Sequence, residues 1–182
     1  SGPSGLTTEQ SALVSFSATD AASFECAVDA GDFAACTSPV SLGGLADGPH
    51  AFRVRASDAA GNVDLTPANR SWTVDTTAPE TAIDSGPSGL TNDATPEFTF
   101  SSEAGARFEC SLDDGAFAAC SSPLAATALA DGDHTFAVRA VDAVGNADAT
   151  PAALSFSVDT AAPETTIDAE PDADLVHVRG TV

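Results

Sequence analysis

Four cysteines are the residues of this sequence whose type and spacing most clearly permit covalent chemistry. They lie in two stretches that align without a gap, FECAVDAGDFAACTSP at 24–39 and FECSLDDGAFAACSSP at 108–123. The pairs are Cys26 with Cys36 and Cys110 with Cys120. Because the pairs recur at identical places, they predict one structural disulfide in each stretch and an oxidising compartment. Two pairs of reduced, buried thiols are the alternative.

Acidic and amide side chains around a repeated Gly-Asn turn form the second group of residues that could do chemistry, here the binding of a metal ion. Ca²⁺ takes about six to eight oxygen ligands from carboxylates, amide side chains and backbone carbonyls. The spacing is not that of an EF-hand loop, so the alternative is an Asp-capped turn with a left-handed residue on an acidic, soluble surface. The calcium hypothesis takes as ligands Asp58, Asn62, Asp64, Asp75, Glu80, Asp142, Asn146, Asp148 and Asp159, with Asp47, Glu103 and Glu164 as further candidates.

Charge and composition exclude several classes of function. The 27 acidic and 6 basic side chains give a net charge of −21, which repels the phosphates of nucleic acids and of anionic lipids. All basic side chains are Arg, so neither a Lys–Asn isopeptide bond nor lysine-based catalysis is available. No apolar run approaches the ~20 residues of a membrane-spanning helix. No Ser, His and Asp triad is recognisable by spacing and no cysteine is left over, so the sequence predicts a protein that is not an enzyme.

The cysteines and the acidic loops must be positioned by short segments in which apolar and polar residues alternate. Val14 and Phe16 alternate with Ser, and Phe98 and Phe100 alternate with Thr and Ser, which is typical of strands with one buried face. The cysteine stretch reverses at an Asp/Gly turn, which should place Cys36 across from Cys26. Strands of about 4 to 7 residues, turns every 8 to 12 residues and no helical period predict an all-β sandwich.

The whole sequence repeats with a period of about 84 residues, which predicts a tandem array. We expect one module at 1–75, a second at 76–160, and the start of a third module or a linking strand at 161–182. The segment SGPSGLT occurs at 1–7 and 85–91, and its Gly and Pro predict a loop.

Several motifs resemble those of the tandem bacterial immunoglobulin-like repeats of secreted and cell-surface proteins. They are VDTTAPET at 74–81, FECSLDDG at 108–115 and LADGDHTFAVRAVDAVGN at 129–146, and the resemblance covers nearly all of residues 1–168. It implies tandem seven-stranded immunoglobulin-like β-sandwiches close to fibronectin type III, located extracellularly or on the bacterial cell surface. His50 and His134 then stand in for the tyrosine of that fold's tyrosine corner, bonded to the turn backbone.

The implied topology places the acidic loops at the ends of the modules. The loop before the last strand faces the pole at which the chain enters, so loop 142–148 should face the linker at 75–80. The equivalent loop of the first module should face a preceding module, and Asp159 with Glu164 should face a following one. Calcium at such a joint would offset repulsion between acidic modules and stiffen the connection.

Three functions fit these features. The first is a stalk or spacer in an adhesin-like surface protein, whose partners are neighbouring modules of the same chain. The second is a module that binds a cell-surface glycan or protein through its loops, although aromatic residues are only 6% of the sequence. The third is a filament subunit that assembles by strand addition, because the first module lacks the short strand ETAID of 80–84 while a spare copy, ETTID, lies at 164–168. Trimming of a longer chain is the alternative explanation, since it produces the same offset.

Overall fold

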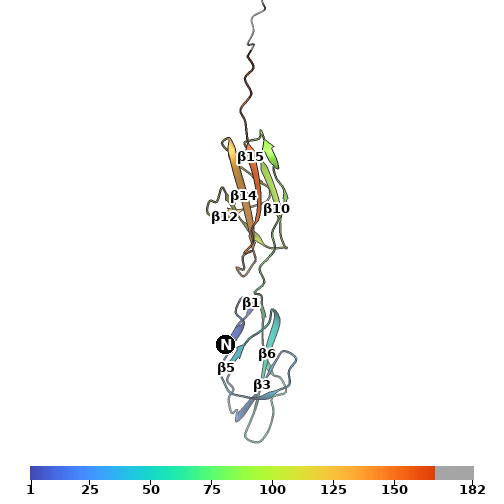
Figure 1. The fold of residues 1–182 in the computed structure, drawn as a ribbon. Helices are drawn as coiled ribbons and strands as arrows, with labels where there is room; N and C mark the ends of the chain where they lie inside the picture. Colours follow the sequence, from blue (N-terminus) through green and yellow to red (C-terminus); the bar gives the residue numbers. More distant parts are fainter. Residues whose placement is uncertain (167–182) are drawn as a thin grey trace, which may run out of the picture.

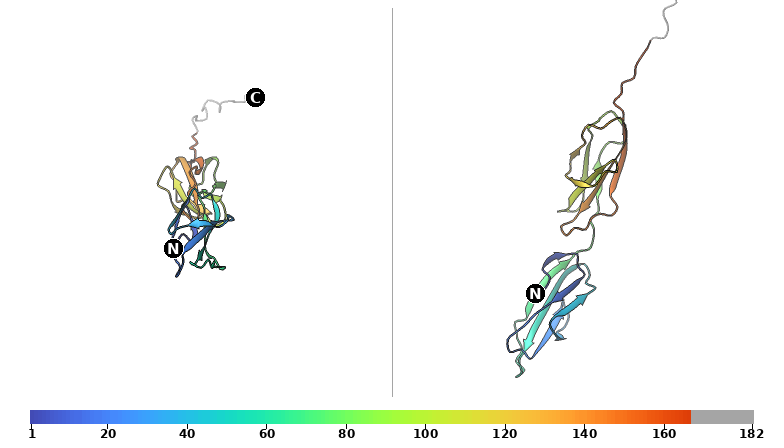
Figure 2. Two further views of the ribbon diagram at one scale, coloured as in Figure 1. Left: turned by 90° about the horizontal axis from the view of Figure 1, so that it is seen from below. Right: turned by 90° about the vertical axis from the view of Figure 1, so that its left-hand side faces the viewer.

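The computed structural model describes residues 1–166, which form two β-sandwiches that follow one another along the chain (Figure 1). Figure 2 shows this arrangement from two further directions. The described residues contain no helix that is long and apolar enough to cross a membrane. The predicted fold class, tandem immunoglobulin-like sandwiches with one disulfide each, is confirmed. The predictions for residues 167–182, including the end of the ETTID strand, lie outside the described residues.

The first sandwich consists of seven strands in two sheets. The larger sheet has the order β1-β7-β6-β3-β4, and the smaller one pairs β2 with β5. All neighbours are antiparallel except β1 and β7, which run parallel. The strands are β1 (Gly5–Thr7), β2 (Ser11–Val14), β3 (Ser23–Val28), β4 (Ala34–Cys36), β5 (Val40–Gly43), β6 (Gly48–Ser57) and β7 (Ala68–Val74).

The second sandwich repeats this order and adds a strand at its start. Its larger sheet is β12-β11-β14-β15-β9, and its smaller sheet is β13-β10-β8. The strands are β8 (Ala82–Ser85), β9 (Gly89–Thr91), β10 (Glu97–Ser101), β11 (Arg107–Leu112), β12 (Ala118–Cys120), β13 (Leu124–Ala125), β14 (Gly132–Val141) and β15 (Ala152–Val158). Eight segments occur because β8 and β9 join different sheets, β8 pairing with β10 and β9 with β15.

The SGPSGLT segments are only partly loops, so this prediction was wrong for their last three residues and for Ser85, the last residue of β8. Gly5–Thr7 and Gly89–Thr91 are the strands β1 and β9, each parallel to the last strand of its module. Gly5 and Gly89 have φ of 73° and 66°, a conformation that glycine adopts without a Cβ clash. The local sequence indicated the bend but not the pairing, because the partner strand lies at the other end of the module.

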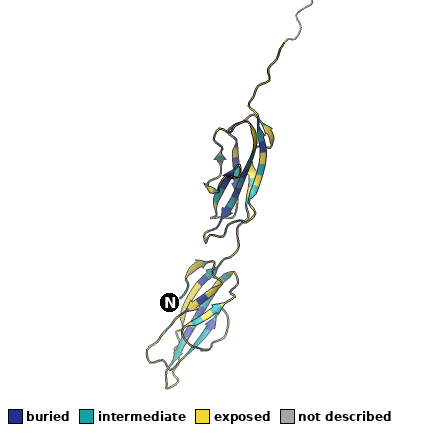
Figure 3. Ribbon diagram, turned by 60° about the vertical axis from the view of Figure 1, so that its left-hand side comes forward, coloured by how far each residue is buried: buried dark blue, intermediate teal, exposed yellow. Residues whose placement is uncertain are grey.

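Each sandwich encloses its own core, as the alternation along its strands requires (Figure 3). In β14, Phe136, Val138 and Ala140 are at most 1% exposed. The intervening Arg139 points outward, where its guanidinium lies 2.7 Å from the Glu109 carboxylate. Alternation with a period of two therefore gives these central strands one buried face and one solvent-exposed face.

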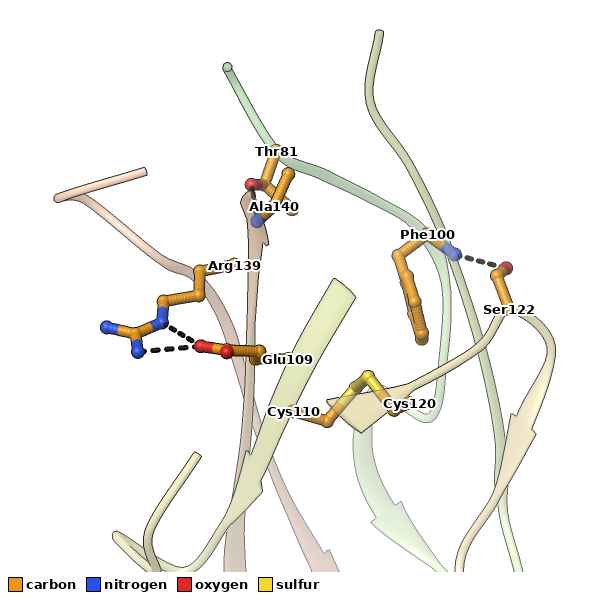
Figure 4. Close-up of a disulfide and its surroundings, with 8 residues drawn as sticks. All are labelled: Thr81, Phe100, Glu109, Cys110, Cys120, Ser122, Arg139 and Ala140. Carbon is orange, nitrogen blue, oxygen red and sulfur yellow. Dashed lines mark hydrogen bonds and ion pairs between the residues drawn. A yellow bond between two sulfur atoms is a disulfide. The ribbon is translucent and has the colours of Figure 1, made fainter. Parts of the chain in front are cut away.

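The cysteine pairs form disulfides between adjacent strands. Cys26 is bonded to Cys36 and Cys110 to Cys120, each pair with Cα atoms 5.8 Å apart. Figure 4 shows the second disulfide beside Phe100, on the opposite side of β11 from the Glu109–Arg139 ion pair. The pairing is diagonal, because Cys26 lies opposite Ala34 in the register, not opposite Cys36 as expected. A diagonal neighbour still lies within bonding reach of a cysteine side chain.

Candidate functional site

The loop that follows β14 is built around one buried carboxylate. Asp142 is 4% exposed, and its Oδ1 accepts hydrogen bonds from the backbone N–H groups of Val144, Gly145 and Asn146 at 2.7 to 2.9 Å. Its Oδ2 accepts a hydrogen bond from Asn146 Nδ2 at 2.7 Å. Burial raises the pKa of Asp142, but the hydrogen bonds from Asn146 and the loop amides outweigh burial and hold that pKa below its usual value. The loop is therefore a rigid turn around an ionised Asp.

The Asn146 side chain connects this loop to the linker between the modules by hydrogen bonds. Besides Asp142, its Nδ2 contacts the backbone oxygens of Asp75 at 3.0 Å and Thr77 at 3.3 Å. These acceptors lie about 70 residues earlier in the chain. One side-chain amide thus ties the second module to the linker that enters it.

The far half of the linker is bound to the second module by Thr81 and its neighbours. The Thr81 N–H donates to Asp148 Oδ2 at 3.1 Å, and its Oγ1 accepts the Ala140 N–H at 2.8 Å. Ser102 donates to the backbone oxygen of Glu80 at 2.6 Å. Burial raises the pKa of Asp148, but hydrogen bonds from Thr81 and Thr150 outweigh it, so the pKa is lowered. Asp148 is therefore ionised although it is only 4% exposed, and it holds Thr81 in place.

The near half of the linker is bound to the first module. Asp47 accepts hydrogen bonds from the hydroxyls of Thr76 and Thr77, both at 2.8 Å. These side-chain hydrogen bonds, from Thr77 and then Thr76, hold the pKa of Asp47 below its usual value. The Asp75 N–H also donates to the backbone oxygen of Thr7 in β1. Both halves of the linker are therefore fixed to folded structure.

Comparison with known proteins identifies the second module. Residues 77–160 match the family model of the bacterial Ig-like domain. The second module is therefore similar to bacterial Ig-like domains. The first module repeats its sequence and its sheet order, with β1-β7-β6-β3-β4 matching β9-β15-β14-β11-β12. No curated protein matches the sequence.

Two solved structures are similar to the Ig-like pair. Fibronectin(III)-like modules of Clostridium thermocellum CbhA are 17% identical, with a TM-score of 0.41 over 85% of this chain and 88% of that chain. A tetra-tandem repeat from the extending region of a large adhesion protein is 21% identical, with a TM-score of 0.34. The alignment with the latter covers 85% of this chain and 46% of that one.

The structure brings some of the predicted calcium ligands of the Ig-like pair together and separates others. Asp142, Asn146 and the Asp75 backbone oxygen meet at the joint, whereas Asp148 binds the Thr81 N–H and the Glu80 backbone oxygen binds Ser102. Asp58, Asp64 and Asp159 bind residues of their own loops: Asp58 accepts from Ala60 and Asn62, Asp64 from Thr66, and Asp159 from Ala161. Asp47 instead binds Thr76 and Thr77 of the linker. Within residues 1–166, no three His, Cys, Asp or Glu side chains lie close enough together to hold a metal ion.

Calcium binding at the joint stays a prediction with a simple measurement. A bound ion would require the Asn146 amide to turn, so that its oxygen joins Asp142 Oδ2 and the linker carbonyls. We expect calcium to raise the Tm of the second module relative to chelator, because binding to the folded state alone stabilises it. Asp142→Asn should abolish the increase and Asp58→Asn, the matched change in the first module, should preserve it. Equal midpoints with calcium and with chelator would contradict the prediction.

Each Ig-like module also contains a histidine that joins two turns. His50 Nε2 lies 2.8 Å from the Ala46 backbone oxygen, and His50 Nδ1 lies 2.9 Å from Asp29 Oδ2. Both ring nitrogens face acceptors, so both must donate, which favours the imidazolium. The hydrogen bond to the Ala46 carbonyl, followed by that to Asp29, raises the pKa of His50. His134 makes the same contacts with Ala130 and Asp113, so the histidines have the structural role that the sequence indicated.

Two sets of contacts at the joint were not predicted from the sequence. They are those of Thr81 with Asp148 and Ala140, and those of Asp47, named only as a calcium candidate, with the hydroxyls of Thr76 and Thr77. The repeat contained a signal for the second set, because Asp131 and Thr160 form the same hydrogen bond at the same sequence separation of 29. A pair that recurs at a fixed separation in both repeats indicates a contact that each module needs.

Proposed function

We propose that this chain is a spacer, in which bacterial Ig-like modules joined by a stiff linker hold other parts of an exported protein away from the cell. The observation that carries the proposal is the linker, which both modules bind through hydrogen bonds. Asp47 of the first module binds Thr76 and Thr77, and Asn146 of the second binds the backbone oxygens of Asp75 and Thr77. A linker held from both sides resists bending, and stiffness is what a spacer requires.

An extracellular, cell-surface location is part of the proposal. The disulfides support it, because such bonds persist in oxidising compartments and are rare in the cytosol. The match of residues 77–160 to the bacterial Ig-like domain supports this location as well. The motifs of the sequence resemble such repeats in secreted and cell-surface proteins. Neighbouring modules of the same chain are the partners that the proposal requires, since the acidic loop of the second module already contacts the linker.

Asn146→Ala tests the stiffness of the joint. The substitution removes the side-chain contacts to Asp75 and Thr77, so we expect a wider range of angles between the modules. The measurement is small-angle X-ray scattering, in which the maximum dimension should fall and the distance distribution should broaden. Asn62→Ala is the matched control, because Asn62 occupies the equivalent loop and its side chain binds Asp58 in its own turn.

The proposal fails if Asn146→Ala and Asn62→Ala give the same scattering curve as the unmodified chain. It also fails if the unmodified chain shows the broad distribution of two modules on a free tether. A thermal scan of each variant checks that both modules remain folded, so that a change in scattering reports on the joint.

A further inference from the structure

One turn of the first module contacts both a largely buried histidine and the linker. In this turn, at 45–48, the Ala46 backbone oxygen lies 2.8 Å from His50 Nε2, and the His50 side chain is 11% exposed. The next residue, Asp47, accepts hydrogen bonds from the hydroxyls of both linker threonines. Adjacent residues of one turn therefore bind the histidine and the linker.

The other ring nitrogen of His50 binds a turn that further hydrogen bonds hold in place. His50 Nδ1 lies 2.9 Å from Asp29 Oδ2, and Asp29 Oδ1 accepts the Ala51 N–H at 2.8 Å. Arg53 Nη2 donates to the backbone oxygens of Asp29 and Gly31. These bonds keep Asp29 in position whatever the charge of the histidine ring.

The turn at 45–48 depends more strongly on the histidine. Backbone contacts anchor its two ends. The residues between them, Ala46 and Asp47, are bound by His50 and by the linker threonines. Losing the bond to His50 therefore frees the part of the turn that binds the linker.

Both contacts of His50 require a protonated ring. A backbone oxygen and a carboxylate can only accept, so each ring nitrogen must donate a hydrogen. When the ring loses one proton, the remaining N–H stays with Asp29, because a hydrogen bond to a charged acceptor is the stronger one. The lone pair of Nε2 then faces the Ala46 oxygen at 2.8 Å, where two acceptors repel each other. Loss of the proton therefore pushes the turn away from the ring.

The groups that surround His50 favour the protonated ring. Asp29 faces it from the turn after β3; burial raises the pKa of Asp29, but hydrogen bonds from Ala51 and His50 outweigh burial and lower that pKa. Asp47 lies on the turn before β6, with its carboxylate bound to the linker. Arg53 of β6 binds the backbone of the Asp29 turn. The residues of β1 and β7 that line the hollow beside the ring are uncharged.

Few groups of this chain change their charge near neutral pH. The sequence has three His, no Tyr and no Lys, and its four cysteines are bonded in disulfides. Arginine stays charged, and ordinary carboxylates are ionised above about pH 5. A change in the joint between about pH 6 and 9 therefore reports on the histidines or on the terminal amine.

We propose that His50 is a proton-operated latch: the protonated ring holds the turn that binds the linker, and loss of its proton releases that turn and loosens the joint between the modules. The first module then pivots at the start of the linker, because Asn146 still binds the linker backbone from the second module. The inference rests on the proposed spacer function and adds its regulation by pH.

The contacts of the ring determine the direction of the pH dependence. The hydrogen bond to the Ala46 oxygen, followed by that to Asp29, raises the pKa of His50 above its ordinary value of about 6.5. The contact with the turn is therefore fully present below about pH 6.5 and is lost as the pH rises through the raised pKa. The joint is stiff in mildly acidic solution and loosens in alkaline solution.

The second module contains the same arrangement at the end where the chain leaves it. His134 Nε2 lies 2.9 Å from the Ala130 oxygen, and its Nδ1 lies 2.8 Å from Asp113 Oδ2. The next residue of that turn, Asp131, accepts the Thr160 hydroxyl at 2.7 Å. The turn, its histidine and the segment that follows the module thus form one repeated unit.

The charges beside the two histidines differ. The hydrogen bond to its turn is the main cause that raises the pKa of His134, and the charge of the neighbouring Asp133 raises it further. The uncharged Pro49 occupies the equivalent place beside His50. We therefore expect His134 to keep its proton to a higher pH than His50.

Distances between spin labels on the two modules test the latch. Ser71→Cys and Ala153→Cys place the labels at exposed positions of β7 and β15, and the native cysteines are bonded to each other. Pulsed electron paramagnetic resonance should give a narrow distance distribution at about pH 6 and a wider one at about pH 9. The midpoint of this widening should match the titration of His50.

Three variants of the labelled chain assign the response. His50→Gln removes the titrating group, so its distance distribution should be the same at both pH values. His134→Gln is the matched control at the far end of the second module and should keep the full response of the joint. Asp47→Ala removes the acceptor of the linker hydroxyls and should give the wide distribution at both pH values. Thermal scans establish that both modules of each variant remain folded.

Nuclear magnetic resonance of the ring nitrogens in the unmodified chain supplies a second readout. Both ring nitrogens of His50 should be protonated at about pH 6, with a titration midpoint above about pH 6.5 and a still higher midpoint for His134. The carboxyl resonance of Asp47 should change with the same midpoint as His50. A His50 midpoint at or below about pH 6.5 would overturn the proposal.

The label distances separate failure of the latch from failure of the spacer. A distribution that is equally narrow at both pH values, or a pH response that persists in His50→Gln, would overturn the latch and leave the spacer function intact. A distribution that is equally wide at both values in the unmodified chain would overturn both.

Discussion

Replacing Cys110 and Cys120 with alanine should lower the Tm of the second module by about 15 to 20 °C and leave the first module unchanged. The bond closes a loop with a sequence separation of 10. In the chain-entropy account, a loop of this length contributes about 3 kcal/mol by restricting the unfolded state. In a domain of this size each kcal/mol corresponds to about 4 to 8 °C in Tm.

Calorimetry of the full chain measures this effect, because the two cores are separate and should melt as separate transitions. The matched variant replaces Cys26 and Cys36, which form the equivalent bond of the first module. It should shift the other transition by a similar amount. A shift of less than about 3 °C in either variant would show that the disulfides contribute little to the stability of these small modules.

The strands and disulfides were predictable because their signals are local. Phe24, Cys26 and Val28 alternate over one strand, and the Asp/Gly turn that follows determines where the chain reverses. The left-handed backbone of Asp29, with φ of 52°, is the kind of conformation that such a turn requires. Fold class and pairing of the cysteines follow from patterns that span fewer than about twenty residues.

The joint was only partly predictable because its contacts are not local. The sequence indicated the Asp142 and Asn146 loop through its Gly-Asn turn, and the implied topology placed that loop near the linker. Nothing local to Thr81 shows that its hydroxyl accepts the Ala140 N–H, a partner 59 residues away. A short polar side chain in a linker has many potential partners, and the tertiary structure selects one of them.

The differences between the repeats were harder to interpret than their similarities. Arg70 occupies the place of Leu154, and its guanidinium donates to the backbone oxygens of Gly2 and Pro3. Leu154 instead packs against the core of the second module. The difference therefore replaces an apolar contact with two hydrogen bonds that hold Gly2 and Pro3, beside a cavity of about 180 Å³ that Phe16 and Val54 also line. From the sequence, it is a single change among many.

Phe136→Ala should destabilise the second module by about 4 kcal/mol, the largest loss that we expect from one substitution. Phe136 is 1% exposed, and its ring stacks on Phe98 with centroids 4.0 Å apart. Removing the ring leaves a cavity between the sheets that the strands cannot close, because hydrogen bonds to β11 and β15 hold β14 in place. The expected result is a lower urea midpoint with an unchanged slope for the second transition.

The control for this prediction is a phenylalanine of the same module that lies outside the core. Phe117 is partly buried and packs under the Arg139 guanidinium at 4.5 Å, a contact near the surface. Phe117→Ala should therefore cost about 1 kcal/mol or less. If the two variants lost equal stability, the module would not depend on its inter-sheet core. A difference of several kcal/mol would show that the stability of the module rests on the stacked rings between its sheets, with the surface ring of Phe117 contributing little.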